Sequence, residues 1–163
     1  MRGLVLFVAG ILVGTAVQIG IAQDQPRPIG RLNHVAVSVA NINEALTWYG
    51  EKMGFHEVVR NTNPQGEVMS AYIQVSRDTF VELQQANAQR PAGLNHWGIE
   101  VPDIKAAVVA FRGRGLTVSE PGAPSAFTGG ILANITDPIT GGRIELSEQP
   151  PAGKLRKATE SWK

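Results

Sequence analysis

The sequence predicts an α+β protein made of two tandem modules, each ordered as a strand, a helix and three further strands. An internal repeat is the main observation, because LNHVAVSV at residues 32–39 reappears as LNHWGIEV at 94–101, an offset of 62 positions. A helical pattern follows each copy, and VEL at 81–83 is matched by IEL at 144–146 near the end of each half. Self-similarity at a fixed period indicates duplicated structural units.

Composition sets the bounds on size and partners. The 163 residues are 43% hydrophobic and 18% charged, an ordinary globular composition with room for one core. Without Met1–Ala22, whose only charged residue is Arg2, the chain has 14 basic and 14 acidic residues, so no electrostatic argument favours nucleic acid as a partner. The absence of cysteine excludes disulfides, thiolate nucleophiles and cysteine metal sites.

Residues 1–22 differ in kind from the rest of the chain. Arg2 precedes an apolar stretch that ends in small residues before the polar QDQP at 23–26. This pattern predicts a secretory signal peptide, with an uncleaved anchor over residues 4–22 as the alternative. We therefore expect an exported domain, periplasmic or secreted, that contacts a membrane only if this segment is retained. Residues 23–30 are expected to form a linker.

The first module is expected over residues 31–86. Asn41 is a good N-cap for a helix whose apolar residues recur at helical spacing, and Gly54 should end that helix. The predicted elements are a strand at 34–39, the helix at 42–53, and strands at 55–59, 68–75 and 80–84.

The second module is expected over residues 93–149, with Asp103 as the N-cap and Gly115 as the stop of its helix. Its predicted elements are a strand at 96–101, the helix at 104–114, a short strand at 116–118, and a hairpin of strands at 131–136 and 143–148. Residues 150–163 are predicted to be a polar tail. The domain as a whole spans 31–149.

Each module places one histidine at the start of its first strand and one glutamate in its last strand. These residues are His34 and Glu82 in the first half, and His96 and Glu145 in the second. A carboxylate between branched apolar neighbours is costly to bury unless it is paired, and it occurs twice at matched positions. The matched set indicates a shared cation, although residues on a half-solvated strand face would give the same pattern.

Two imidazoles and two carboxylates suit one divalent ion such as Zn²⁺, Ni²⁺, Co²⁺, Mn²⁺ or Fe²⁺. Such an ion polarises a substrate carbonyl and acidifies the adjacent C–H, and a glutamate that releases it can move the proton. The predicted chemistry is isomerisation by proton transfer, or hydrolysis by bound water, on a small-molecule substrate. No separate cofactor-binding residues are identified.

Over residues 30–149 the chain resembles the vicinal oxygen chelate superfamily, which includes glyoxalase I, methylmalonyl-CoA epimerase, extradiol dioxygenases and bleomycin-resistance proteins. The resemblance rests on LNHVAV at 32–37, WY at 48–49 before MGF at 53–55, and DP at 137–138 before GRIEL at 142–146. It implies that the modules curl into a half-open, eight-stranded barrel with the metal inside. Many members dimerise, so a homodimer is a further expectation.

The ligand pattern His34, Glu82, His96 and Glu145 is most similar to glyoxalase I. That likeness implies a lyase or isomerase in which Glu82 and Glu145 are both ligands and catalytic groups, acting on a small hydroxy-carbonyl compound through a metal-bound enediolate. Methylmalonyl-CoA epimerase usually has glutamine where Glu82 stands. The alternatives are an exported, metal-containing binding protein without catalysis, and an extradiol-type dioxygenase with two histidines and one carboxylate.

Further candidates carry weaker signals. Tyr72 and Glu67 could act as additional acid–base groups, and Arg143, two residues before Glu145, could pair with a carboxylate. Residues 123–130 form a candidate lid. His56 is expected on an exposed strand face. Trp97 is expected in the core against a helix.

Overall fold

The computed structural model describes residues 29–163. The predicted signal or anchor at 1–22 and most of the predicted linker lie outside the described residues. Among the described residues, no helix is long and apolar enough to cross a bilayer.

Ten elements follow one another along the described chain. They are β1 (Arg31–Val39), α2 (Ile42–Met53), β2 (His56–Thr62), β3 (Val68–Ser76), β4 (Thr79–Gln85), β5 (Gly93–Glu100), α3 (Ile104–Gly113), β6 (Ile131–Thr136), β7 (Arg143–Glu148) and α4 (Lys154–Ser161). The predicted α+β class is confirmed, and so is the order of a strand, a helix and three strands in the first module, whereas the second module has two strands after its helix.

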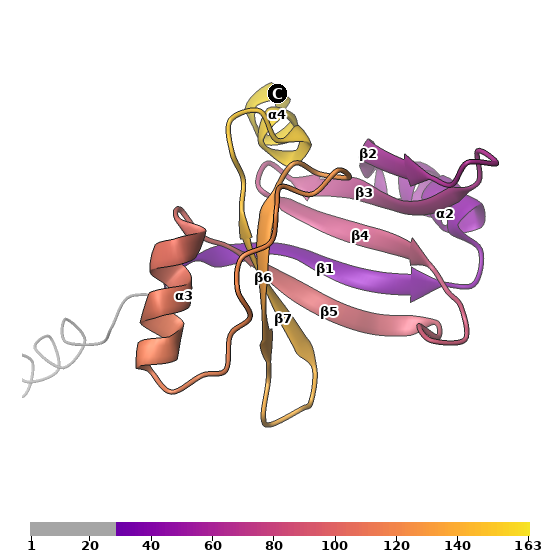
Figure 1. The fold of residues 1–163 in the computed structure, drawn as a ribbon. Helices are drawn as coiled ribbons and strands as arrows, with labels where there is room; N and C mark the ends of the chain where they lie inside the picture. The colour runs from indigo at the N-terminus through magenta and orange to yellow at the C-terminus, as the bar shows by residue number, and fades with distance from the viewer. Residues whose placement is uncertain (1–28) are drawn as a thin grey trace, which may run out of the picture.

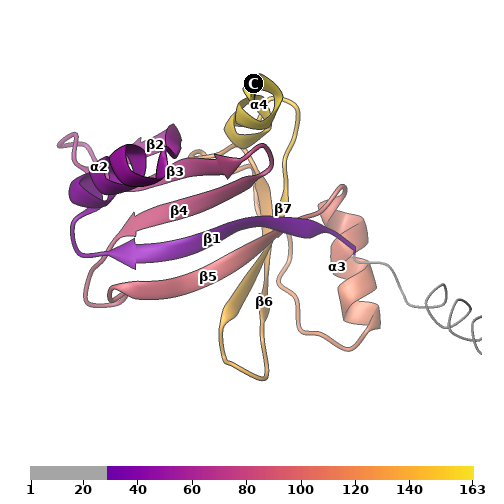
Figure 2. The same cartoon turned by 180° about the vertical axis from the view of Figure 1, so that it is seen from behind.

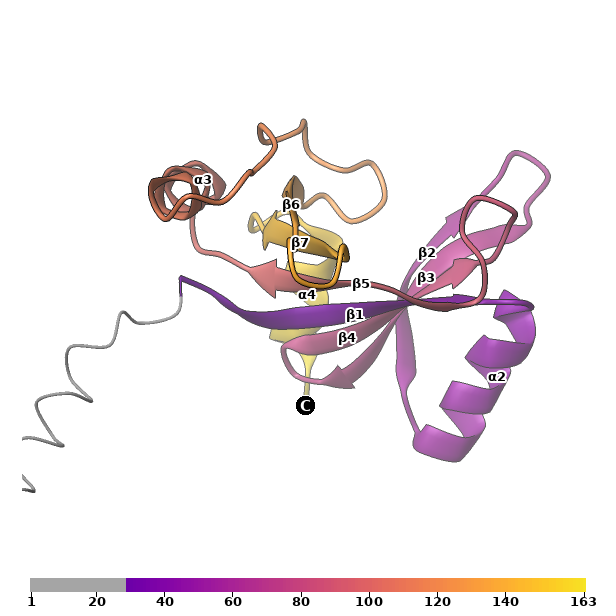
Figure 3. The ribbon, with the colours of Figure 1, turned by 90° about the horizontal axis from the view of Figure 1, so that it is seen from below.

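One curled, unclosed sheet contains all seven strands in the order β2-β3-β4-β1-β5-β7-β6 (Figures 1 and 3). Each half is built alike, since β1 runs parallel to β4 and β5 runs parallel to β7. The two halves join where β1 and β5 pair antiparallel. The junction between the modules is therefore the centre of the sheet.

Seven strands are present among the described residues instead of the expected eight. The short strand expected at 116–118 is reduced to one bridge between Val118 and Ile135 of β6, at the edge where an eighth strand would lie. The N–H groups of Ser119 and Gly122 still donate to carbonyls of β6, but the Asn134 N–H donates to the Ser119 side chain at 2.9 Å instead of to a backbone carbonyl, which interrupts the ladder. The barrel is correspondingly more open on this side.

The helices begin and end where their capping residues predict. The Asn41 side chain accepts hydrogen bonds from the backbone N–H groups of Asn43 and Glu44, and Gly54 ends α2 with φ of 70°. The Asp103 side chain caps α3 in the same way. Figure 2 shows α2 and α3 at opposite ends of the sheet, where α2 packs on β3 and β4, and α3 packs on β6 and β7.

Neither α2 nor α3 covers the central strands β1 and β5. The expectation that Trp97 packs in the core against a helix is therefore wrong, because its side chain on β5 is 39% exposed. The two helices instead bury separate apolar clusters, one around Ile42 and Leu83 and one around Ile104 and Leu146.

The segment expected as a polar tail contains a helix. Leu155 and Ala158 of α4 are buried against Val59, Tyr72 and Phe80 in a third apolar cluster. The backbone carbonyl of Ala158 also accepts a hydrogen bond from the Gln74 side chain at 3.2 Å. Residues 150–163 are thus part of the folded unit, not an extension of it.

Candidate metal centre

Four adjacent strands at the centre of the sheet carry the four predicted ligands. His34 lies on β1, Glu82 on β4, His96 on β5 and Glu145 on β7. In the strand register, Ala36 is opposite both His96 and Glu82, while Gly98 is opposite both His34 and Glu145. The four side chains therefore share one face of the sheet, and each residue is at most 7% exposed.

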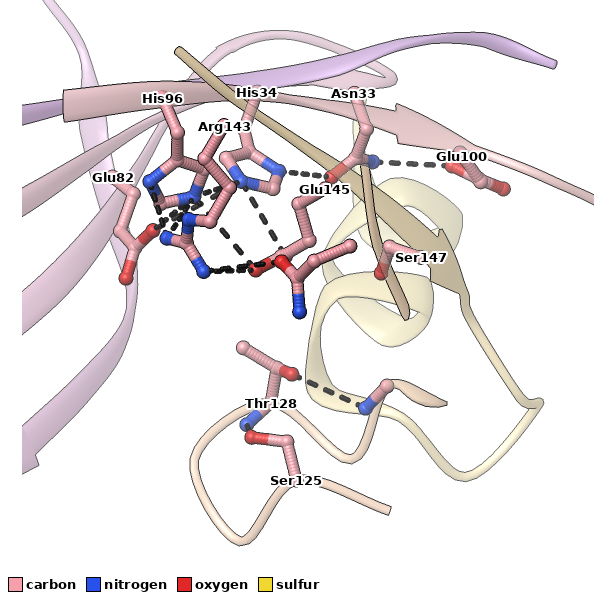
Figure 4. A network of polar contacts seen from close by, with 12 residues as sticks. Asn33, His34, Glu82, His96, Glu100, Ser125, Thr128, Arg143, Glu145 and Ser147 are labelled. Atoms are coloured by element: carbon pink, nitrogen blue, oxygen red, sulfur yellow. Dashed lines mark hydrogen bonds and ion pairs between the residues drawn. The ribbon is translucent and has the colours of Figure 1, made fainter. Parts of the chain in front are cut away.

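The ligand atoms of this set converge at one point (Figure 4). The Nε2 atoms of His34 and His96 are 3.2 Å apart. Glu145 Oε1 is 3.6 Å from His34 Nε2, and Glu145 Oε2 is 3.8 Å from His96 Nε2. Glu82 Oε2 is 3.5 Å from His96 Nε2 and 3.9 Å from His34 Nε2. We call these four side chains the cage.

An asparagine fixes the tautomer of His34. The Asn33 Nδ2 group donates to Glu100 Oε2 at 3.1 Å, so its Oδ1 atom faces His34. That oxygen lies 3.0 Å from His34 Nδ1, which must therefore donate. His34 Nε2 is then unprotonated and presents its lone pair to the cage.

His96 has the same neighbour in the second module. Its Nδ1 lies 2.7 Å from Asn95 Oδ1. Asn33 and Asn95 are each skipped in the β1–β5 register, at the two irregularities of that pair. Such a bulge lets a residue leave the strict alternation of a strand, so each asparagine can reach the imidazole that follows it.

A guanidinium lies against the cage. Arg143 Nη1 is 3.4 Å from Glu145 Oε2, and its Nη2 is 2.5 Å from Nδ1 and 3.0 Å from Nε2 of His96. With the Nδ1 proton directed at Asn95 Oδ1, as in the matching Asn33–His34 pair, the acceptor for Arg143 is Nε2. Arg143 therefore occupies a lone pair that a metal ion would need.

The donor set fits a divalent ion. Ligand atoms bound at about 2.0–2.2 Å in tetrahedral or octahedral geometry lie about 3–3.5 Å apart, close to the contacts of the cage. His34, His96 and Glu145 form a buried group whose ligand atoms all lie within 4.8 Å of one another. Two lone pairs and two carboxylates facing one point repel each other unless a cation lies between them.

Burial changes the pKa of every group in the cage. Burial and the nearby Arg143 charge lower the pKa of His34 to about 4, and the same causes, with smaller contributions from His34 and Arg90, lower that of His96 to about 3. Burial, followed by the Glu82 charge, raises the pKa of Glu145 to about 7. Burial also raises the pKa of Glu82, against the hydrogen bond from Gln84. Both imidazoles are therefore neutral and ready to bind a metal near pH 7.

Of the weaker candidates from the sequence, Tyr72 lies beside the cage, whereas Glu67 and His56 do not. Tyr72 is buried with its ring 5.4 Å from that of His34, and burial followed by the Glu82 charge raises the pKa of its phenol further. Glu67 does not reach the site, since it is exposed and accepts a hydrogen bond from Asn63 in a loop. His56 is exposed at the start of β2, as expected.

A cavity of about 280 Å³ opens beside the cage. Ser125, Phe127 and Thr128 of the expected lid segment line it, as Arg90 and Arg143 do. Phe127 packs against Tyr72 with ring centroids 5.4 Å apart, so this loop forms one wall.

Sequence reasoning did not identify Asn33, Asn95, Arg90 and Gly98 as parts of the site. The repeated Asn-His pair at 33–34 and 95–96 was the available signal for the asparagines. Position 98 requires a glycine, because the Cβ atom of any other residue would lie 2.5 Å from Nδ1 and 2.7 Å from Nε2 of His34. No pattern in the sequence marks Arg90, which lies in the connector between the modules.

Comparison with known proteins matches residues 31–146 to the family described as the glyoxalase/bleomycin resistance protein/dioxygenase superfamily. A comparison with curated protein sequences gives no match.

Solved structures of similar fold include methylmalonyl-CoA epimerases. A selenomethionine form is 24% identical, with a TM-score of 0.63 over 77% of this chain and 99% of the other. The enzyme from Mycobacterium tuberculosis is 21% identical, with a TM-score of 0.65 over 80% and 96%. A complex with methylmalonyl-CoA and NH4+ is 16% identical, with a TM-score of 0.61 over 78% and 99%.

Proposed function

The chain belongs to the glyoxalase/bleomycin resistance protein/dioxygenase superfamily, and we propose that it is a divalent-metal-dependent isomerase or lyase of the glyoxalase type. The proposed substrate is a small hydroxy-carbonyl compound, on which the protein moves a proton. The observation that carries the proposal is the convergence of two imidazole Nε2 atoms and two buried carboxylates beside a cavity. His34, Glu82, His96 and Glu145 would hold the ion.

A bound dication would polarise the substrate carbonyl and acidify the neighbouring C–H bond. The protein's own side chains would then transfer the proton. Glu82 and Glu145 approach the imidazoles from β4 and β7, on either side of the β1–β5 pair, so a substrate in the cavity lies between two candidate bases. In the metal-free cage, burial and the Glu82 charge raise the pKa of Glu145, so this carboxylate is a strong base when the ion releases it. Tyr72 stays a neutral phenol.

The experiment has two stages. Metal analysis of the purified protein after loading with Zn²⁺, Ni²⁺, Co²⁺, Mn²⁺ or Fe²⁺ should give about one ion per chain, lost in His96→Ala. The loaded protein in D₂O should then exchange the C–H protons of hydroxyacetone, followed by ¹H NMR, and Glu145→Gln should not.

Glu120→Gln is the matched control, because Glu120 is exposed and pairs only with Arg112. Failure to retain any of these metals would sink the proposal. Retention without proton exchange would leave a metal-containing binding protein.

A second candidate, an iron-dependent dioxygenase, has one observation in its favour. The buried group His34, His96 and Glu145 is a set of two histidines and one carboxylate, and the Gln84 amide holds Glu82 at 2.8 Å. Oxygen consumption with catechol by the Fe²⁺-loaded protein, absent in the Zn²⁺-loaded form, would favour this candidate over proton transfer.

Acyl-CoA substrates are a further possibility for the isomerase, because the similar structures include an epimerase complex with methylmalonyl-CoA. Racemisation of methylmalonyl-CoA by the loaded protein would support this choice over hydroxyacetone.

A further inference from the structure

The cavity beside the cage is small and rich in hydrogen-bond donors. Its volume of about 280 Å³ is just below the usual range of ligand pockets, about 300–1,000 Å³, so it encloses a small molecule or the reacting end of a larger one. The hydrogen-bond donors and acceptors on its walls therefore indicate which polar atoms a bound substrate carries.

Three hydroxyl groups on the wall already accept hydrogen bonds from the protein. Ser125 Oγ accepts from the backbone N–H groups of Phe127 and Thr128 at 3.2 and 3.3 Å. Thr128 Oγ1 accepts from the N–H of Gly130 at 3.1 Å, and Ser147 Oγ accepts from the Gln149 amide at 2.6 Å. Among residues 29–163, none of these three hydroxyl groups donates a hydrogen bond, so their protons are available to a ligand.

Two guanidinium groups also line this cavity. Arg90 donates from Nη2 to the Gln85 carbonyl at 3.0 Å, and its buried Nε has no partner. Within the described part of the chain, no carboxylate lies within 4.0 Å of the Arg90 guanidinium. Among residues 29–163, the Arg90 charge thus has no ion-pair partner, although it acts on the Glu82 carboxylate from a greater distance.

Arg143 becomes available when the cage binds a cation. Its contacts are made to His96 Nε2 and Glu145 Oε2, both of which would be metal ligands, and to the nearby Asn134 Oδ1. A His96 lone pair that binds a metal cannot accept from Arg143 Nη2, whereas Glu145 Oε2 and Asn134 Oδ1 can still accept from Nη1. The Nη2 group is then free to donate into the cavity that Arg143 already lines. Since Glu82 and Glu145 neutralise a dication, the positive charges of Arg90 and Arg143 are available to an anion.

We propose that this cavity binds a small 2-hydroxy or 2-oxo carboxylate, whose carboxylate is held by Arg90 and Arg143. This inference rests on the proposed function and specifies its substrate class. A wall of two guanidiniums and three donating hydroxyls is complementary to a ligand with several acceptor oxygens and a negative charge. The oxygen on the second carbon of such an acid faces the cage, where the proton transfer takes place.

The test compares lactate with lactamide, which has nearly the same shape and no charge. Calorimetric titration of the Zn²⁺-loaded protein should show lactate binding about tenfold or more tighter than lactamide, the loss expected for a charge-assisted hydrogen bond. Arg90→Gln should remove about tenfold of the lactate affinity and leave lactamide binding unchanged. This variant separates recognition by arginine from coordination of lactate by zinc.

Arg60→Gln is the matched control, because Arg60 is exposed on β2 and pairs with Glu57. Equal affinity for the two probes, no binding of lactate, or a lactate preference that survives Arg90→Gln would overturn the inference. Tighter binding of inorganic phosphate than of lactate would overturn the choice of a carboxylate.

Zinc content is measured separately in every variant. A protein that holds zinc but does not prefer lactate refutes only the substrate class, whereas a protein that holds no metal refutes the proposed function. In the second case, an Arg90-dependent lactate preference in the metal-free protein would still support the arginine site.

Discussion

Asn33 and Asn95 show how a residue next to a ligand can control it. Strict alternation along a strand would place each asparagine on the face opposite its histidine. The bulges in the β1–β5 pair remove that restriction and bring the Oδ1 atoms within 3.0 and 2.7 Å of the imidazole Nδ1 atoms. Hydrogen bonds of this kind orient a ligand and raise its basicity.

Replacing Asn95 by alanine should weaken metal binding by about 10–100-fold, the usual effect of losing a group that orients a histidine ligand. The His96 ring would lose the acceptor that keeps its proton on Nδ1. Chelator competition measures the affinity, and ¹⁵N NMR of the metal-free protein should show a mixture of His96 tautomers. Asn61→Ala on the exposed strand β2 is the control; an equal loss in both variants would contradict the role.

Replacing Arg143 by glutamine should raise metal affinity, since the guanidinium and the ion compete for His96 Nε2 and Glu145 Oε2. Chelator competition against the wild-type protein measures the change. A lower affinity would show that Arg143 instead supports the metal-bound cage.

Gly98→Ala should abolish metal binding while leaving the protein folded. The added methyl group would overlap the His34 ring and push its Nε2 atom out of the cage. Metal content and circular dichroism check the two parts of this prediction. Gly113→Ala, where a Cβ meets nothing within 4 Å, should retain the metal.

At the residue scale, the sequence was sufficient to find the four side chains that converge in the cage and insufficient to find the residues that contact and orient them. His34, Glu82, His96 and Glu145 were predicted because the repeat places matched chemistry at matched positions. Bulges, and the contact between Gly98 and His34, depend on how two strands meet across the sheet. No local sequence pattern determines how β1 and β5 pair.

At the level of elements, the boundaries with strong local signals were predicted well. The helix expected at 42–53 is α2, and the hairpin expected at 131–136 and 143–148 is β6 and β7. The strand expected at 116–118 and the tail at 150–163 were wrong for opposite reasons. The first loses its ladder because the Ser119 side chain accepts the Asn134 N–H. The second is helical because tertiary contacts bury Leu155 and Ala158, which the polar sequence around them does not indicate.

Leu155 shows the contribution of α4 most directly. It is 1% exposed, so Leu155→Ala should lower the free energy of unfolding by about 2–5 kcal/mol, the range for truncating a buried leucine. Urea unfolding measures the loss, and Lys157→Ala on the exposed side of α4 serves as the control. A change within about 0.5 kcal/mol would mean that α4 does not stabilise the sheet.

For the molecule as a whole, metal binding should depend on pH through Glu145. A metal ion competes with the proton on this carboxyl group, whose pKa is about 7, while the imidazoles lose their protons near pH 4 and below. Affinity should therefore rise as the pH passes through about 7. Since the pKa of Glu145 in the fold lies above its ordinary value of 4.5, its contribution to the stability of the metal-free protein falls over the same rise. The lowered pKa values of His34 and His96 have the opposite sign and add stability as the pH rises to about 6.5.

Thermal unfolding with and without Co²⁺ from about pH 5.5 to 8.5 measures this dependence, because a ligand that binds only the folded state raises its stability in proportion to its affinity. Glu145→Gln should remove the rise near pH 7. If the stabilisation by Co²⁺ instead rose around pH 6.5, and still did so in Glu145→Gln, the titrating group would be a histidine and not Glu145.

The β1–β5 pair has a consequence for how the two halves of the chain hold together. Each half supplies one imidazole and one carboxylate, and neither can complete the cage alone. The only backbone link between the halves is the connector at 86–92. If that connector were cut, free metal concentration would govern how tightly the fragments reassociate, as it does for subunits that share an ion. Because one chain carries both halves of the cage, the ion would act as a reversible cross-link within a single polypeptide.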